Sequence, residues 1–386
     1  MKKIVLFTSS LSQGGAEKVL ASVSLNLPIE YQKTIVVYDD SRVDYEYDGN
    51  LVTLKAKASN NILLKFKTFY YRVKEMKDIK KQNNVDVAIS FLDSPNFVNL
   101  FSKSNEKVIV SVRNFKSVNK KSLYDKIFKL AMKLFYNKAD TIVAVSNLIK
   151  HDLINNYGIL EDKIAVINNP YNVTQIKKMS DEEISEMEQQ VFKNPTLINV
   201  GRFNKQKGQR HLINIVGVLR KSIPNIQLIF LGEGSMEEEL KKQVEVLDLK
   251  ENIHFWGFKK NPYKYISKAD IFVFPSLHEG FPNALVEAMA CGTPVISSDC
   301  KSGPREILAP GTDIFSQTKE SERTNYGVLM PVIEENKEEL INIWSSEIVK
   351  LLNDKRTLKK YSNLGIDRAK EFSIDKTIQQ WIEIIE

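Results

Sequence analysis

The chain has 386 residues, of which 42% are hydrophobic and 27% are charged, and its formal net charge at pH 7 is +7. That length predicts two folded domains rather than one core, and the composition excludes a largely disordered chain. Two cysteines, and four histidines without ligand-like spacing, argue against a disulfide framework and a structural metal, and the positive charge favours an anionic partner.

The first predicted element is a buried strand over residues 3–7. Lys2, Lys3 and the apolar residues after them imitate a secretory signal, but the apolar run is too short for one and a Gly-rich turn follows it. Elsewhere no apolar stretch has the length that spans a bilayer. We therefore expect a protein of the cytoplasm.

Short apolar runs alternate with helical patterns along the chain, which is typical of parallel strands covered on both faces. In the first half these runs lie at 3–7, 33–38, 85–91, 107–112 and 141–146. After a pause at 168–170 and an acidic segment, they resume at 196–203, 226–234, 252–258, 270–276 and 293–299.

The pattern predicts an α/β fold with two Rossmann-like, doubly wound domains that face a central cleft. We place the first domain at 1–172, the second at 173–370 and a final helix at 371–386. Because such sheets bind ligands beyond the carboxyl ends of their strands, the loops at those ends are the candidate sites.

One such loop carries Gly201, Arg202 and Lys207 ahead of a helix. Gly201 lets the backbone approach a ligand, Arg202 offers a planar fork of donors, and Lys207 adds a point charge. Together they suit a phosphate or diphosphate near a helix N-terminus. A surface turn with solvated cations is the alternative that the local sequence leaves open.

The next loop contains Gly232 and Gly234, a G-x-G pair after a strand. A tight turn explains this pair as well as a ligand does, and Met236 replaces the third glycine of a dinucleotide fingerprint. NAD binding is therefore disfavoured. In the first half, Gly14 and Gly15 follow the first strand and allow the same two interpretations.

The third loop, within the stretch 276–299, holds two glutamates, Glu279 and Glu287, on either side of a Gly-Phe-Pro-Asn turn. Pro282 suits a helix start because its missing N–H would be unpaired there, and the amides from about Asn283 onward can face an anion. A carboxylate beside such a site is a poor phosphate contact. It is a good acceptor for sugar hydroxyls.

Taken in order, these motifs resemble those of the retaining nucleotide-sugar glycosyltransferases of the GT-B type in family 4, also called group 1. The resemblance covers nearly the whole chain and is most specific in EGFPNALVEAMACGTPVI, which contains Glu279 and Glu287. It also includes Gly14-Gly15-Ala16-Glu17 and the segment SGPREIL from Ser302.

By this resemblance Arg202 and Lys207 bind the donor diphosphate, Glu287 the ribose hydroxyls and Glu279 the transferred sugar. Catalysis is assigned to Glu279, Arg202 and Lys207. The other implied donor-side positions are Gly15, Gly201, Gly234, Phe258 at the base, Gly280, Phe281, Asn283 and Ala284, with support from Ser302, Gly303 and Glu306.

The resemblance further implies a metal-independent reaction without a cofactor, in which the acceptor attacks from the face that the diphosphate leaves. Glu279 then positions the sugar and forms no covalent bond. No metal ligands are predicted. The final helix is expected to cross back onto the first domain.

On the acceptor side the chain departs from the pattern of the family. Many relatives have a histidine where this chain has Arg113 and Asn114. We therefore predict acceptor contacts from these two residues, from Gly14, and from Asp93 and Asn96 in the segment SFLDSPNF.

Two basic segments, near 65–81 and 115–138, interleave lysines with apolar and aromatic residues; the second has seven lysines and one acid. Such a helix could rest on an anionic bilayer, or it could pack on its own domain with solvated lysines. No nucleic-acid-binding module is recognisable.

The predicted function is retaining transfer of a hexose or N-acetylhexosamine from a UDP-sugar to a lipid-linked saccharide acceptor. It would belong to bacterial surface polysaccharide or oligosaccharide biosynthesis, peripheral on the inner face of the cell membrane. A non-catalytic nucleotide-sugar or glycan-binding module, or an inverting GT-B transferase or epimerase, are the alternatives.

Overall fold

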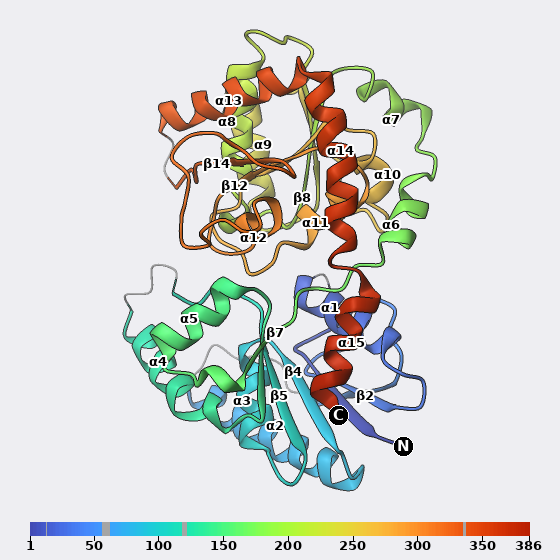
Figure 1. Ribbon diagram of the computed structural model, residues 1–386, viewed down its shortest axis with the longest axis vertical. Helices are drawn as coiled ribbons and strands as arrows, with labels where there is room; N and C mark the ends of the chain where they lie inside the picture. The colour runs from blue at the N-terminus through green and yellow to red at the C-terminus, as the bar shows by residue number, and fades with distance from the viewer. Residues whose placement is uncertain (13, 56–61, 118–121, 335–336) are drawn as a thin grey trace. The chain divides into compact units, whose positions relative to one another are not determined.

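The chain forms two compact units (Figure 1). The computed structural model describes residues 1–12, 14–55, 62–117, 122–334 and 337–386. Unit 1 comprises Met1–Pro170 and Ile374–Glu386, and unit 2 comprises Tyr171–Ser373. The boundaries expected from the sequence, after residues 172 and 370, lie close to the two points where the chain passes from one unit to the other.

Unit 1 is built on a seven-stranded parallel sheet with the order β3-β2-β1-β4-β5-β6-β7. The strands are β1 (Lys3–Phe7), β2 (Gln32–Val37), β3 (Asn50–Thr53), β4 (Val87–Phe91), β5 (Lys107–Val112), β6 (Thr141–Ala144) and β7 (Ile164–Val166). The central strands are almost wholly buried because helices cover both faces.

The helices of unit 1 are α1 (Gly15–Asn26), α2 (Ile62–Gln82), α3 (Asp93–Phe101), α4 (Leu123–Phe135), α5 (Asn147–Tyr157) and α15 (Ile374–Ile385), with short 3₁₀ turns at Tyr136–Lys138 and Glu161–Lys163. Although α15 comes last in the chain, Trp381 and Ile385 share one core cluster with Ile4 and Leu6 of β1. The final helix is therefore part of the first core.

Unit 2 repeats the design with the order β10-β9-β8-β11-β12-β14-β13, in which only β13 is antiparallel among the pairings of the described residues. Its strands are β8 (Thr196–Val200), β9 (Gln227–Leu231), β10 (Ile253–Phe255), β11 (Ile271–Phe274), β12 (Val295–Ser298), β13 (Glu322–Arg323) and β14 (Val328–Met330). The carboxyl ends of β8, β9, β11 and β12 thus meet at one sheet edge.

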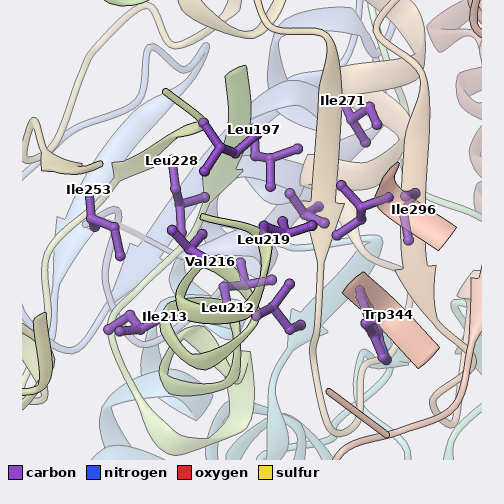
Figure 2. Packing of buried hydrophobic residues seen from close by; sticks show 14 of the residues in the cluster. Leu197, Leu212, Ile213, Val216, Leu219, Leu228, Ile253, Ile271, Ile296 and Trp344 are labelled. Carbon is purple, nitrogen blue, oxygen red and sulfur yellow. The ribbon is translucent and has the colours of Figure 1, made fainter. Parts of the chain in front are cut away.

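The helices of unit 2 are α6 (Val173–Ser180), α7 (Glu186–Val191), α8 (Gln209–Leu219), α9 (Glu237–Val246), α10 (Tyr263–Ile266), α11 (Asn283–Ala290), α12 (Pro304–Leu308), α13 (Glu338–Leu352) and α14 (Lys355–Lys370), with a 3₁₀ turn at Lys205–Lys207. Figure 2 shows Leu212 and Val216 of α8 packed beneath Leu197 and Leu228 of the sheet. Among the described residues, no helix is both long and apolar enough to cross a membrane.

Candidate active site

The turn between β11 and α11, residues 279–283 (the EGFPN turn), is braced by the loop after β12. Glu279 N–H donates to the Lys301 carbonyl at 2.8 Å, and Ser302 Oγ donates to the Gly280 carbonyl at 2.7 Å. Gly303 has φ +99°, and a Cβ on it would lie 2.6 Å from Cδ of Pro282. The turn therefore keeps its shape through close backbone contact with the 301–303 loop.

Two of the predicted site residues form an ion pair. Lys207 Nζ lies 2.7 Å from Glu279 Oε1, and the side chains are only 21% and 9% exposed, respectively. The same Nζ lies 5.3 Å above the ring of Phe274, at the end of β11. The cation and the carboxylate thus neutralise each other.

The loop after β8 is tied to the strand end that leads into the EGFPN turn, which explains how Lys207 reaches Glu279. Gln206 Nε2 donates to the His278 carbonyl at 2.7 Å, and Leu277 N–H donates to the Gln206 carbonyl at 2.8 Å. Gly208, at φ +67°, starts α8 so close to the sheet that a Cβ would meet the Pro275 carbonyl at 2.3 Å. Arg202 stands exposed at the beginning of this loop.

The glycines of the first two loops pack backbone against backbone. A Cβ on Gly232 would lie 2.1 Å from the Gly201 carbonyl oxygen, and one on Gly234 would lie 2.3 Å from the Phe203 carbonyl oxygen. Gly232 N–H also donates to Gly257 O at 2.9 Å. The tight-turn interpretation of the G-x-G pair therefore accounts for these glycines, whose loops hold Gly201 and the half-exposed Phe258 at the same sheet edge.

Helix α11 begins at Asn283 and carries Glu287 one turn further on. Pro282 occupies the N-cap in extended conformation, as the sequence predicted for a helix start. Glu287 is buried, whereas Asn283 and Ala284 remain half-exposed. The Asn283 side-chain oxygen accepts a hydrogen bond from Tyr171 Oη at 2.9 Å, and Phe281 is buried.

A group of ion-paired side chains that the sequence analysis did not identify lies after β12. The buried Arg305 donates through Nε to Asp299 at 3.1 Å and through Nη2 to Glu322 at 2.7 Å. Burial raises the pKa of Asp299, against hydrogen bonds from Arg305 that lower it. Burial, followed by the charge of Glu279, also raises the pKa of the Cys300 thiol, which is therefore protonated at neutral pH.

Glu306 is half-buried on α12, and its carbonyl accepts from Arg368 Nη2 at 2.8 Å. Within the described ranges, no group of three or more His, Cys, Asp and Glu side chains is arranged to hold a metal ion.

The predicted acceptor-side residues of unit 1 divide into edge and core positions. Gly14 caps α1 and its N–H donates to Tyr45 Oη at 3.3 Å, with Gly15 as the first helical residue. The carboxylate of Asp93 pairs with Lys116 Nζ at 2.5 Å. Asn114 is exposed.

Arg113 is mostly buried. Its guanidinium donates to Ser111 Oγ at 3.3 Å and to Asn169 Oδ1, and lies 5.6 Å from the centroid of the Phe91 ring. These contacts fix the side chain within unit 1.

The prediction for Asn96 is wrong. Its side chain is fully buried, donates to the Ser111 carbonyl at 2.9 Å and accepts from Ser90 Oγ at 2.8 Å. Helix α3 turns this amide onto β4 and β5, where it satisfies polar groups of the core. Asn96 therefore has no exposed polar atom to offer an acceptor.

A cavity of about 480 Å³ opens at the carboxyl edge of the unit 1 sheet, among residues that the sequence analysis missed. Its walls are Ser9, Ser10, Ser12, Tyr38, Asp39, Ser41, Arg42, Arg72 and Ser94. The Arg72 guanidinium lies 3.6 Å from the Tyr38 ring centroid, and Tyr38 Oη lies 3.0 Å from Ser94 Oγ.

Burial raises the pKa of Tyr38 to about 12, so its hydroxyl keeps its proton at neutral pH, and burial lowers the pKa of Arg72, against the effect of Tyr38. The available signal was positional, since Tyr38 directly follows β2 and Ser9 lies two residues after the end of β1.

Both basic segments present apolar side chains to solvent. On α4, Ile127, Leu130 and Leu134 are 58%, 56% and 56% exposed, while Phe128 packs on Phe97 of α3 at 5.7 Å. On α2, Phe66 and Tyr70 are each 72% exposed. Residues 118–121 of the second segment lie outside the described residues.

Two family models match consecutive parts of the chain. The model described as "Glycosyltransferase Family 4" matches residues 13–175, and that described as "Glycosyl transferases group 1" matches residues 180–328.

Similar proteins extend this match over nearly the full length. An uncharacterized glycosyltransferase of Methanocaldococcus jannaschii is 33% identical over 383 residues, covering 92% of this chain and 93% of the relative. The N-acetylgalactosamine-N,N'-diacetylbacillosaminyl-diphospho-undecaprenol 4-alpha-N-acetylgalactosaminyltransferase of Campylobacter jejuni is 29% identical and covers 96% of each chain. The crystal structure of Anabaena HepE with UDP and glucose has the same fold, with a TM-score of 0.78 at 18% identity over 100% of this chain and 99% of that one.

Proposed function

Because this chain belongs to the group 1 glycosyltransferases and has two parallel-sheet α/β domains of the GT-B type, we propose that it moves a hexose or N-acetylhexosamine from a UDP-sugar to a saccharide acceptor, with retention of configuration. The observation that carries this proposal is the Lys207–Glu279 ion pair, whose carboxylate belongs to the EGFPN turn. It combines a cation suited to a diphosphate with a carboxylate suited to sugar hydroxyls.

On the donor side, Lys207, the exposed Arg202 and the amides at the start of α11 would receive the diphosphate. Capture of Lys207 by phosphate would release the Glu279 carboxylate to accept hydrogen bonds from the sugar. Glu287 would hold the ribose and Phe258 would lie against the base. Uridine is chosen by analogy with HepE, whose structures contain UDP.

In the proposed reaction the bond between the anomeric carbon and the phosphate oxygen breaks, and the acceptor hydroxyl attacks from the same face. The acceptor proton passes to the departing phosphate oxygen. Arg202, Lys207 and the α11 dipole stabilise the charge that develops on the diphosphate, so the mechanism needs no metal ion. Glu279 orients the sugar throughout.

The acceptor would enter the unit 1 cavity. Its five serines and Tyr38 suit sugar hydroxyls, and Arg42 and Arg72 suit an anionic group. The name of the Campylobacter relative specifies a diphospho-undecaprenol acceptor. We extend the same acceptor class to this chain, as a saccharide joined through a diphosphate to a lipid in surface-glycan synthesis.

A lipid-linked acceptor requires contact with a membrane, and α4 supplies a suitable face. Ile127, Leu130 and Leu134 would enter the interface while Lys126 and Lys133, both exposed, meet anionic head groups. Vesicles containing anionic lipid should float the protein, and Leu130→Glu with Leu134→Glu should abolish this. Leu160→Glu, at a leucine equally exposed elsewhere in unit 1, is the matched control.

A donor screen tests the central proposal. Purified protein is mixed with each UDP-, GDP- and ADP-sugar, and thermal stabilisation, slow hydrolysis and the anomeric configuration of the product are measured. At least one UDP-sugar should stabilise the fold and turn over to the α-product, and Arg202→Ala should abolish the stabilisation by UDP. Stabilisation without turnover indicates a binding module, and a β-product indicates an inverting enzyme.

A further inference from the structure

The two places where the chain crosses between units lie side by side within unit 2. Tyr171 is the first residue of this unit and Ser373 the last. The two residues form a parallel bridge, and Tyr171 N–H donates to the Phe372 carbonyl at 3.1 Å. The crossings are therefore joined to each other by backbone contacts.

Both crossings contact the EGFPN turn directly. The buried Tyr171 donates its hydroxyl proton to the side-chain oxygen of Asn283 at 2.9 Å. The ring of Phe372 packs edge-on against Phe281, with centroids 5.1 Å apart and an interplanar angle of 73°. One crossing thus holds the first residue of α11, and the other holds the centre of the turn.

A third contact joins the second crossing to α12. Arg368 lies with its guanidinium carbon 4.7 Å from the Phe372 ring centroid and donates to the carbonyls of Glu306 and Ile307 at 2.8 and 3.0 Å. Helix α12 follows Gly303, which packs against Pro282 of the turn. The crossings, the turn and α12 consequently form one continuous packed set.

We infer that Tyr171 and Phe372 are positioning residues of the donor site, which transmit nucleotide binding at the EGFPN turn to the two chain crossings. The inference rests on the proposed function, because it requires a nucleotide diphosphate at the start of α11. Such an anion would fix the amides from Asn283 onward. A buried hydroxyl–amide hydrogen bond and a buried ring contact resist independent movement of their partners, so a change at the turn reaches residues 171 and 372.

The coupling works in both directions by thermodynamic necessity. Hinges in proteins are a few residues at loops or element ends that absorb changes of backbone angle. Donor binding would therefore restrict the crossings, and crossings held by Tyr171 and Phe372 would favour the bound form of the turn.

Hydrogen exchange of the whole protein, with and without UDP, tests this inference. The variants are Tyr171→Phe, which removes one hydroxyl, Phe372→Leu, and the double substitution. Tyr265→Phe is the matched control because it removes the hydroxyl of another buried tyrosine of unit 2, which donates to Glu188 at 3.1 Å rather than to the turn. Melting temperatures establish that each variant folds.

In the wild-type protein, UDP should slow exchange in peptides covering 279–290 and also in those covering 168–173 and 370–376. We expect at least about fivefold slowing at the crossings, the lower end of typical coupling between sites. Tyr171→Phe should reduce it severalfold and the double variant should remove it, while protection of 279–290 persists. Tyr265→Phe should behave as wild type.

Slowing at 279–290 without any at the crossings would overturn the inference and leave the donor site intact. Persistence of the crossing effect in the double variant would also overturn it. If UDP slows no exchange at 279–290 of the wild type, the UDP site itself is refuted, and the coupling falls with it.

Activity supplies a second measurement. If wild type turns over a UDP-sugar, Tyr171→Phe should lower kcat for transfer about fivefold, the effect of one net hydrogen bond. Its KM for the donor should change less. Equal kcat in the variant and the wild type would contradict a positioning role.

Discussion

The Lys207–Glu279 ion pair predicts that the free-energy costs of replacing its two partners are not additive. Each single substitution leaves one charge without its partner, whereas the double substitution removes both charges. Removing one member of a fully buried ion pair typically costs about 3–5 kcal/mol, because the other charge stays buried without its partner. Lys207 keeps 21% of its side-chain exposure, so water reaches it and the cost is smaller. We expect about 2 kcal/mol for Lys207→Met and about 1 kcal/mol for Glu279→Gln.

The double variant should be less destabilised than the sum of the single variants by about 1–2 kcal/mol, the interaction expected of residues in contact. Urea unfolding followed by tryptophan emission measures it, since two of the three tryptophans, Trp256 and Trp344, lie in unit 2. An interaction energy below about 0.5 kcal/mol would refute the pairing, because distant sites already add to within that value.

Calorimetric titration of the same variants with UDP separates the role of Lys207 in binding the diphosphate from that of Glu279 in positioning the sugar. Lys207→Met should weaken UDP binding about tenfold or more, because a charge-assisted hydrogen bond to phosphate is lost. Glu279→Gln should bind UDP at least as tightly as wild type, since the carboxylate that competes for Lys207 is gone, yet turn over UDP-sugar more slowly. Wild-type UDP affinity in Lys207→Met would place the diphosphate elsewhere.

Three further substitutions test other parts of the structure. Arg72→Ala should raise KM for the saccharide acceptor about tenfold through loss of a charged contact, with UDP-sugar hydrolysis unchanged, and an unchanged KM would remove the cavity from the acceptor site. Gly303→Ala should cost about 2 kcal/mol more than Gly311→Ala in urea unfolding, because both glycines have positive φ but only Gly303 has an atom, Cδ of Pro282, within 3 Å of a new Cβ. Asn96→Ala should lower the free energy of unfolding by about 2 kcal/mol and leave KM for the acceptor unchanged, because its amide serves the core; a raised KM would restore it to the acceptor side.

The fold could be predicted from the sequence because strands buried on both faces leave continuous apolar runs. Each run predicted in the first half overlaps a strand of unit 1; the run 85–91, for example, contains β4 at 87–91. The edge strand β3 was not predicted, since its four residues are partly exposed and half of them polar. Edge strands lack the double burial that makes the central ones recognisable.

The loops that carry Arg202, Lys207, Glu279 and Glu287 could also be located, because the carboxyl ends of parallel strands share one edge. Their contacts could not. Lys207 and Glu279 are 72 residues apart, and the hydrogen bond between Tyr171 and Asn283 spans 112 residues. Both depend on how one loop packs on another, for which short-range periodicity contains no signal.

Asn96 and Asp93 show why residue type alone misplaces a side chain. Both follow β4 in a polar loop-like segment, yet one lies in the core and the other at the edge. The difference arises because Asp93 begins α3, where the helix dipole stabilises a carboxylate that stays half-exposed. Asn96 lies three residues further on, on the face that α3 turns to the sheet. An asparagine amide can satisfy a carbonyl and a hydroxyl at once, so its burial there costs little, and the segment reads as polar although half of it is core.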